Sequence, residues 1–246
     1  MTRKNTITLC IALLVVSIAS ATYAQVDKRH EVYPELDVWI RTTPDQQVYL
    51  YVPFTKSLDD DYHQVGLGAM YSWSFDQNDL AMFDWLVARE NSENFRNFTA
   101  RVGYYYAQSL GDSGSAYTEQ YIPAEFHIRM YSVVGILITD RNRIEVGKIN
   151  SENVFRYRNK LTIERQFKLI DQIRITPYAN IEASFDSRYN TFNRIKTTVG
   201  AKLPIFSFFS VDGYYAFSND TRSSIQNKHG AGLTLNLYIE PKDVFN

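Results

Sequence analysis

Basic and acidic residues alternate with uncharged ones along two stretches of the chain. Residues 141–145 carry Arg, Arg and Glu at every second position, and residues 156–164 carry Arg, Arg, Lys and finally Glu on the same alternation. Guanidinium groups present paired hydrogen-bond donors to oxyanions, so this cluster could attract anions or the phosphates of a lipid or sugar. The same side chains could instead neutralise one another across neighbouring strands. The sequence favours the ion-pair network and leaves both interpretations open.

Acid–base or metal chemistry has weaker support. Glu125, His127 and Arg129 share one alternating face, but a histidine beside a carboxylate is more often a structural hydrogen-bonding residue than a general base. His63 follows Asp59–Asp61, and three consecutive acids at a turn are typical of a solvated loop rather than a metal site. Nucleophile-elbow, zinc-protease and phosphate-loop motifs do not occur. We therefore expect no enzymatic activity, no cofactor and no metal.

The N-terminal segment predicts export. Two basic residues precede the apolar run 7–21, and small residues lead up to Ala24, as at a signal-peptidase site. The run is shorter than the roughly 20 residues of a membrane-spanning helix, which favours a cleaved signal peptide over residues 1–24. The single cysteine, Cys10, lies inside it, so the mature domain, residues 25–246, contains no thiol.

An alternation of period two, typical of β-strands, returns throughout the mature chain. In residues 62–75, for example, Val65, Leu67 and Trp73 share an apolar face while glycine and serine residues take the other. The pattern predicts about twelve strands, with ten to fourteen as the range. Their expected bounds are 36–43, 47–54, 62–75, 80–89, 97–110, 121–130, 133–147, 154–167, 172–185, 191–203, 206–218 and 228–239.

An even number of strands would return both ends of the chain to one side of a membrane. Two segments fit the alternation badly. Residues 80–89 are apolar on both faces, and in residues 133–147 the alternation would leave Asp140 and Asn142 facing outward. The second misfit suggests a bulge or an additional turn near Thr139.

The face opposite the apolar one collects most of the charged residues, several of them deep inside their strands. The weaker candidates on this face are Glu125, His127 and Arg129. The residues that we expect to line the lumen of a barrel are Arg141, Arg143, Glu145, Arg156, Arg158, Lys160, Glu164, Arg174, Glu182, Arg194 and Lys196.

Composition bounds the function further. A net charge of -1 excludes a nucleic-acid binder that works by bulk positive charge, and 15% aromatic residues suit sheets and membrane interfaces. Aromatic side chains near the strand ends of the apolar faces, together with the export segment, favour an outer-membrane barrel. A soluble sandwich or barrel, with its apolar face sequestered and its charges in water, is the alternative.

Several of these motifs resemble a known bacterial family. The stretch Arg141-Asn142-Arg143-Ile144-Glu145, the Arg-rich stretch 155–165 and the early Pro34-Glu35-Leu36-Asp37-Val38-Trp39 are similar to proteins of the domain of unknown function 2490. The resemblance covers nearly all of the mature chain. It implies an outer-membrane β-barrel without an established activity.

The sequence thus predicts an all-β protein, a transmembrane antiparallel up-and-down barrel in the outer membrane. We expect a monomer that contacts outer-membrane lipid and the outer-membrane assembly machinery, and no nucleic acid. Its expected role is a narrow pore or a conduit for anions or small solutes with a basic lumen. The alternatives are the soluble ligand-binding β domain and, less favoured, a lipid-modifying barrel enzyme that would use His127.

Overall fold

The computed structural model describes residues 28–75, 97–110, 117–132, 135–170, 173–222 and 226–240. Every regular element among them is a β-strand, which confirms the predicted all-β class. The strands are β1 (Lys28–Thr43), β2 (Gln46–Ser57), β3 (His63–Phe75), β4 (Phe98–Leu110), β5 (Thr118–Tyr131), β6 (Leu137–Ile149), β7 (Glu152–Glu164), β8 (Phe167–Ile170), β9 (Ile173–Asp186), β10 (Thr191–Phe206), β11 (Phe209–Asp220) and β12 (Asn227–Ile239). The predicted signal peptide and the predicted strand 80–89 lie outside the described residues.

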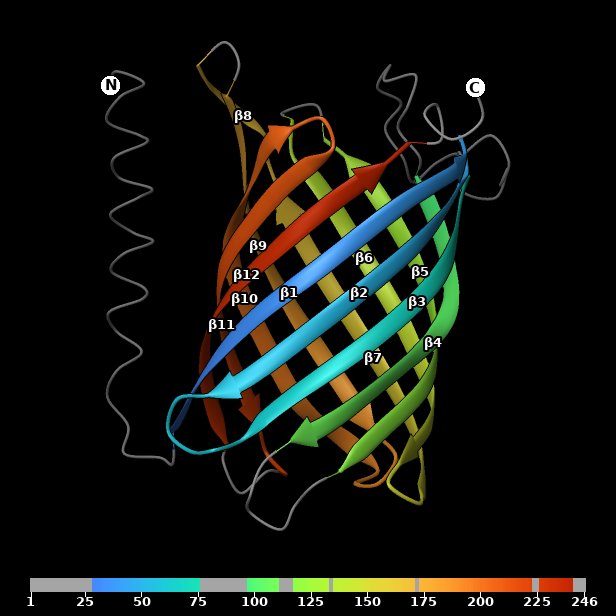
Figure 1. The fold of residues 1–246 in the computed structure, drawn as a ribbon, viewed down its shortest axis with the longest axis vertical. Helices are drawn as coiled ribbons and strands as arrows, with labels where there is room; N and C mark the ends of the chain where they lie inside the picture. Colours follow the sequence, from blue (N-terminus) through green and yellow to red (C-terminus); the bar gives the residue numbers. More distant parts are fainter. Residues whose placement is uncertain are drawn as a thin grey trace.

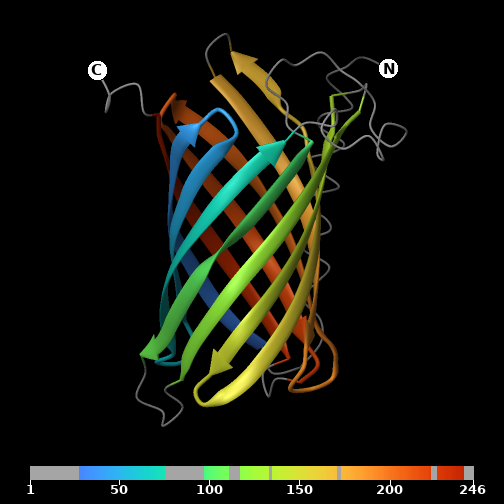
Figure 2. The same ribbon diagram turned by 90° about the vertical axis from the view of Figure 1, so that its right-hand side faces the viewer.

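Eleven of these strands close a barrel in which neighbours in sequence are neighbours in the sheet (Figures 1 and 2). The twelfth, β8, continues the line of β7 and pairs only with the first residues of β9. β8 and the start of β9 therefore extend beyond the closed part of the barrel, at the top of Figure 1. The barrel agrees with the predicted architecture, within the expected range of strand number. No helix among the described residues is long and apolar enough to cross a membrane.

The odd number of closing strands has a geometric consequence. All other neighbours are antiparallel, but β1 and β12 pair in parallel, from Lys28 opposite Asn227 to Ile40 opposite Ile239. Lys28 and Ile239 therefore lie at opposite ends of the barrel. From an even strand count we expected both ends of the mature chain on one side. Eleven strands close the barrel instead, so the ends of the described strands lie on opposite sides and the expectation is wrong for them.

The apolar side chains face outward and the polar ones face the lumen, as the alternation predicts. On β3, Leu67 is 60% exposed, while Ser72 on the opposite face is fully buried. On β5, Ile122 is 58% exposed and the neighbouring Tyr121 is 2% exposed. A water-soluble barrel needs the reverse arrangement, because it must sequester its apolar face. The alternative of a sequestered apolar core does not fit these faces.

The misfit in the predicted strand 133–147 has a different cause from the one expected. β6 begins at Leu137, and its register with β5 and β7 runs without a shift through Thr139. Neither the bulge nor the additional turn lies at Thr139. The turn before β6 is closed by the Ser132 N–H, which donates to Ile136 O at 2.8 Å. Asp140 and Asn142 do face outward among apolar residues. Hydrogen bonds from Asn159 and Asn142 to the Asp140 carboxylate, at 2.7 Å and 3.0 Å, satisfy it locally.

Candidate functional site in the lumen

Cross-strand register brings the two basic stretches together. β6 and β7 pair so that Arg141 lies opposite Lys160, Arg143 opposite Arg158 and Glu145 opposite Arg156. β9 then places Glu182 opposite Lys160. All of these side chains point into the barrel, because they occupy the same alternating face of their strands. The charged residues predicted from the sequence are thus gathered on one side of the lumen.

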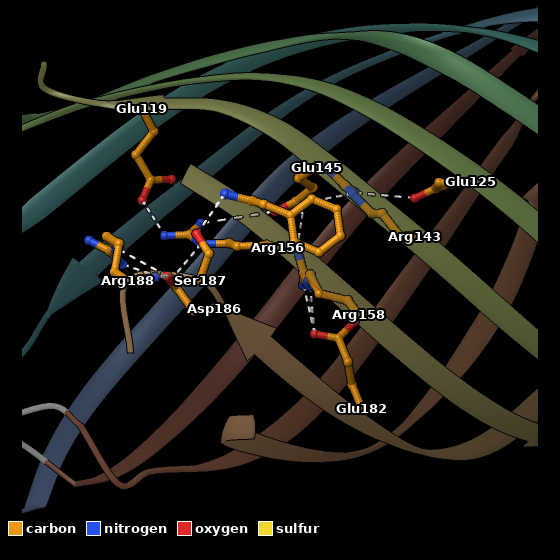
Figure 3. A network of polar contacts seen from close by, with 11 residues as sticks. Glu119, Glu125, Arg143, Glu145, Arg156, Arg158, Glu182, Asp186, Ser187 and Arg188 are labelled. Carbon is orange, nitrogen blue, oxygen red and sulfur yellow. Dashed lines mark hydrogen bonds and ion pairs between the residues drawn. The ribbon is translucent and has the colours of Figure 1, made fainter. Parts of the chain in front are cut away.

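Glu145 and Glu182 are the two centres of an ion-pair network (Figure 3). Glu145 is 2% exposed and lies 2.7 Å from Arg143 Nε and 3.2 Å from Arg158 Nη1. Glu182 lies 2.7 Å from Arg158 Nη2 and 2.6 Å from Arg141 Nη2. Arg158 therefore bridges the two carboxylates and ties β6, β7 and β9 together. Buried charges of this kind are tolerated only when they are paired in this way.

Glu125 on β5 is a third centre. It accepts a hydrogen bond from Arg143 at 3.2 Å and lies 2.9 Å from His127 Nε2. Arg101 on β4 approaches the same carboxylate at 3.5 Å. Glu125 and His127 are both buried in the lumen, beside arginines. The pair therefore lies inside the barrel rather than on the lipid-facing rim that a lipid-modifying site would need.

The network continues toward one end of the barrel. Arg156 lies 3.0 Å from Asp186 and 3.3 Å from Glu119, and Arg188 lies 2.8 Å from Asp186, as Figure 3 shows. Glu164, expected in this network, instead bonds Lys202 of β10 at 2.6 Å.

Three further cations line the lumen beside this network without such partners. Among the described residues, no carboxylate lies within 4.0 Å of Lys160, Arg194 or Lys196, although the register places both lysines beside Glu182. The Nε of Arg194 is buried and has no hydrogen-bond partner there. The Lys196 ammonium lies over the ring of Tyr33 at 5.0 Å. These three cations therefore lie in the lumen without a direct ion-pair partner among the described residues.

Two predicted lumen residues lie apart from the network. Arg174 has the inward parity, but it pairs with Lys168 in the β8–β9 extension and is exposed there. Arg129 faces inward on β5, yet no ion pair within 4.0 Å joins it to Glu125 in the described part of the chain. Strand alternation predicts correctly which side chains face inward. It does not predict where along a strand the closed barrel ends.

Aromatic rings fill the part of the lumen that adjoins this network. Neighbouring rings on β1, β2, β4 and β5 lie 3.9–6.4 Å apart at small interplanar angles. Guanidinium groups cover both ends of this aromatic ladder, Arg101 at 4.9 Å from the first ring and Arg156 at 4.9 Å from the last. The ladder consists of Trp39, Tyr49, Tyr51, Tyr105 and Tyr121.

Two glycines of β3 make room for this ladder. A side chain at Gly68 would overlap the ring of Tyr51, and one at Gly66 would meet the ring of Tyr105. The rings therefore lie directly over the β3 backbone, which explains why glycine occupies these inward positions. Tyr51 is 6% exposed as a result. This side of the barrel is packed like a protein core.

Inward carboxylates on β1 were not among the predicted site residues. Glu35 interacts electrostatically with Lys160 and Lys196, and Asp37 interacts with Glu35 and with Arg101. The predicted first strand began at 36, whereas β1 begins at Lys28. Extending the alternation backwards through Tyr33 and Arg29 would have placed Glu35 in the lumen.

Comparisons with known proteins add a similarity in structure. No protein-family model matches the sequence, and no curated protein matches it. Among solved structures, the β domain of the Bordetella autotransporter BrkA is similar, with a TM-score of 0.46 and 12% sequence identity. The similarity covers 78% of this chain and 83% of that chain.

Proposed function

We propose that the chain is an outer-membrane β-barrel whose lumen forms a narrow conduit that selects small anions. The observation that carries the selectivity is the set of cations on β7 and β10 that have no carboxylate within 4.0 Å among the described residues. Lys160, Arg194 and Lys196 lie beside Glu182, which already bonds Arg141 and Arg158. Rings of basic side chains are the usual means of anion selectivity in pores.

The outward faces support the membrane location. The strands that close the barrel have 12 to 16 residues, and roughly 9 to 11 tilted residues cross the hydrocarbon of a bilayer. Large apolar side chains are exposed around the barrel, for example Val146 at 56% and Leu233 at 49%. Their exposure to water would be unfavourable by roughly 25 cal/mol for each Å² of apolar surface, whereas lipid removes that cost.

Membership of the family of unknown function 2490 stays part of this proposal, carried by the sequence motifs. Export by the predicted signal peptide and insertion by the outer-membrane assembly machinery belong to it as well. The absence of enzymatic activity stays a prediction.

The membrane location is tested by fractionation and heat-modifiability. The protein is expressed with its N-terminal segment, and outer-membrane extracts are run on a detergent gel with and without boiling. We expect enrichment in the outer membrane and a band whose mobility shifts on boiling, because a closed barrel resists detergent until it is heated. A soluble periplasmic protein with one mobility would refute the location.

Selectivity is tested in planar bilayers under a KCl gradient. We expect the wild-type reversal potential to lie toward the Cl⁻ equilibrium potential, and the double variant Lys160→Glu/Lys196→Glu to move it toward that of K⁺. The control is Lys148→Glu, a reversal at an exposed outward position of β6. An unchanged reversal potential in a correctly folded double variant, or a wild-type barrel without conductance, would refute the conduit.

The two lysines are a sharper choice for this test than Arg156 and Arg158, which also belong to the expected lumen charges. Both arginines pair with buried carboxylates in the network, so reversing them would remove one of the cations beside each of Glu145, Glu182 and Asp186 and add a like charge there. Reversing these two arginines should therefore disturb folding as well as selectivity.

A further inference from the structure

The outer face of β6 and β7 carries a group of polar side chains within the apolar band. Asp140 and Asn142 on β6, and Tyr157 and Asn159 on β7, face outward and bond one another; we call these four residues the outer polar cluster. Exposed apolar residues surround it, with Ile144 at 44% and Ile163 at 48% exposure. Polar groups on a lipid-facing surface are unfavourable and rare, and they mark functional contacts.

The hydrogen bonds within the cluster use most, but not all, of its side-chain donors and acceptors. Asn159 Nδ2 donates to Asp140 Oδ1 at 2.7 Å and to Asn142 Oδ1 at 3.1 Å, which uses both of its N–H groups. Asn142 Nδ2 donates to Asp140 Oδ2 at 3.0 Å, and Tyr157 donates its O–H to Asn142 Oδ1 at 2.6 Å.

One N–H of Asn142 and the Oδ1 of Asn159 bond nothing else in the described part of the chain. The cluster therefore presents one free donor and one free acceptor to the membrane. A lipid chain can bond neither of them.

We infer that this face binds a second copy of the chain through a two-fold interface. In such an interface each residue meets its counterpart reciprocally, so a surface that carries both a donor and an acceptor complements itself. The free Asn142 N–H of one copy would bond Asn159 Oδ1 of the other, and the reverse bond would form by symmetry. Side-chain amides bonding between membrane-spanning elements are an established means of association within lipid.

The exposed apolar residues around the cluster would pack at the same interface and shield these bonds from competing polar groups. This inference goes beyond the conduit. It rests only on the proposed membrane location, which fractionation and heat-modifiability test separately. It replaces the expectation of a monomer with that of a dimer.

Cysteine cross-linking in the membrane tests the interface directly. Cys10→Ser removes the only native thiol, and Ile144→Cys then places a thiol beside the cluster. The matched control is Leu36→Cys, an outward position at 39% exposure on β1, five strands away from both β6 and β7 around the barrel. Under mild oxidation we expect a band of twice the monomer mass from Ile144→Cys and only monomer from Leu36→Cys.

A variant of the cluster shows whether its polar groups hold the copies together. Asp140→Leu, Asn142→Leu, Tyr157→Phe and Asn159→Leu, combined with Ile144→Cys, make the face wholly apolar. We expect loss of the dimer band with the boiling-dependent gel shift retained. If that chain does not fold, the single change Asn159→Leu is used instead. It removes the free acceptor Oδ1 and the two hydrogen bonds that Asn159 Nδ2 donates, and it should weaken the dimer band.

Three results would overturn the inference. They are equal cross-linking at Ile144→Cys and Leu36→Cys, a dimer band that the folded cluster variants keep, and a cross-linked product with a different protein in place of the dimer.

Discussion

The two sides of the lumen differ in how their inward side chains are used. On the β2–β6 side, glycines, serines and the four tyrosines of the aromatic ladder pack closely, and Met70, Thr99 and Glu145 are at most 2% exposed. On the side formed by β7 to β12 and β1, long charged side chains such as Lys160 and Lys196 keep part of their surface exposed.

The same alternation of residues therefore gives two outcomes. Where the inward residues are small, neighbouring aromatic rings lie flat on the sheet. Where they are lysines and arginines, charged side chains line the lumen and stay partly exposed. We expect substitutions on the packed side to affect stability most, and under the proposed function a solute would pass along the accessible side, the one with the partly exposed cations. Substitutions on the two sides should consequently affect different measurements.

The largest loss of stability is expected from the centre of the network. Glu145→Leu leaves Arg143, Arg156 and Arg158 without their shared carboxylate, and breaking a buried ion pair costs roughly 3–5 kcal/mol. Urea unfolding in lipid vesicles, followed by tryptophan fluorescence, measures the change. The control is Glu240→Leu, because the Arg41–Glu240 pair is more than half exposed and should contribute less than about 1 kcal/mol. Equal effects of the two substitutions would contradict the network.

A smaller loss is expected from overpacking the aromatic ladder. Gly68→Val drives a side chain into the ring of Tyr51, and such overpacking typically costs about 1–3 kcal/mol. Gly213→Val is the matched control, because a side chain at Gly213 meets nothing within 4 Å. The same unfolding assay should separate the two. Comparable stabilities would mean that the rings do not lie on the β3 backbone.

On the accessible side, stability should change little. Lys196→Gln removes a cation that has no ion-pair partner within 4.0 Å among the described residues, so we expect to lose mainly its contact with the Tyr33 ring, about 0.5–1 kcal/mol. The substitution should nevertheless reduce anion preference in the bilayer assay. A large loss of stability with unaltered selectivity would assign Lys196 to the packed network instead.

The smallest effect concerns the turn between β2 and β3. Hydrogen bonding to the Arg29 guanidinium lowers the pKa of Asp60 to about 2. A lowered pKa stabilises the folded state above the unfolded value of 3.8, and this contribution is lost as the pH falls toward 2. Asp60→Asn should therefore flatten the pH dependence of unfolding between those values, but only slightly, since the Asp60 side chain is 44% exposed. An unchanged slope would mean that solvent screens the pair completely.

Alternation predicted much of this architecture, because inward and outward parity is a local property of a strand. The segments predicted as 97–110 and 172–185 correspond closely to β4 and β9. The predicted lumen charges Arg141, Arg143 and Glu145 do face inward.

The barrel was predicted, but the parallel pairing of β1 with β12 that closes it was not, because it depends on the register between two distant segments rather than on either segment alone. The partners of individual charges also depend on register. Glu164 has the right parity for the arginine network, but its position along β7 brings it to Lys202. The outward Asp140 looked like a break in the alternation of its strand, because its hydrogen-bond partner Asn159 lies on another strand.

The most direct test of the difference between the two sides is the reactivity of single cysteines in the folded barrel, with Cys10 replaced by serine. Lys196→Cys and Ser72→Cys are treated with an anionic and a cationic water-soluble thiol reagent of similar size. The structure predicts that Lys196→Cys reacts, faster with the anionic reagent, and that Ser72→Cys, fully buried on the packed side, does not. Equal labelling of both positions, or faster reaction of Lys196→Cys with the cationic reagent, would contradict an accessible, anion-attracting side of the lumen.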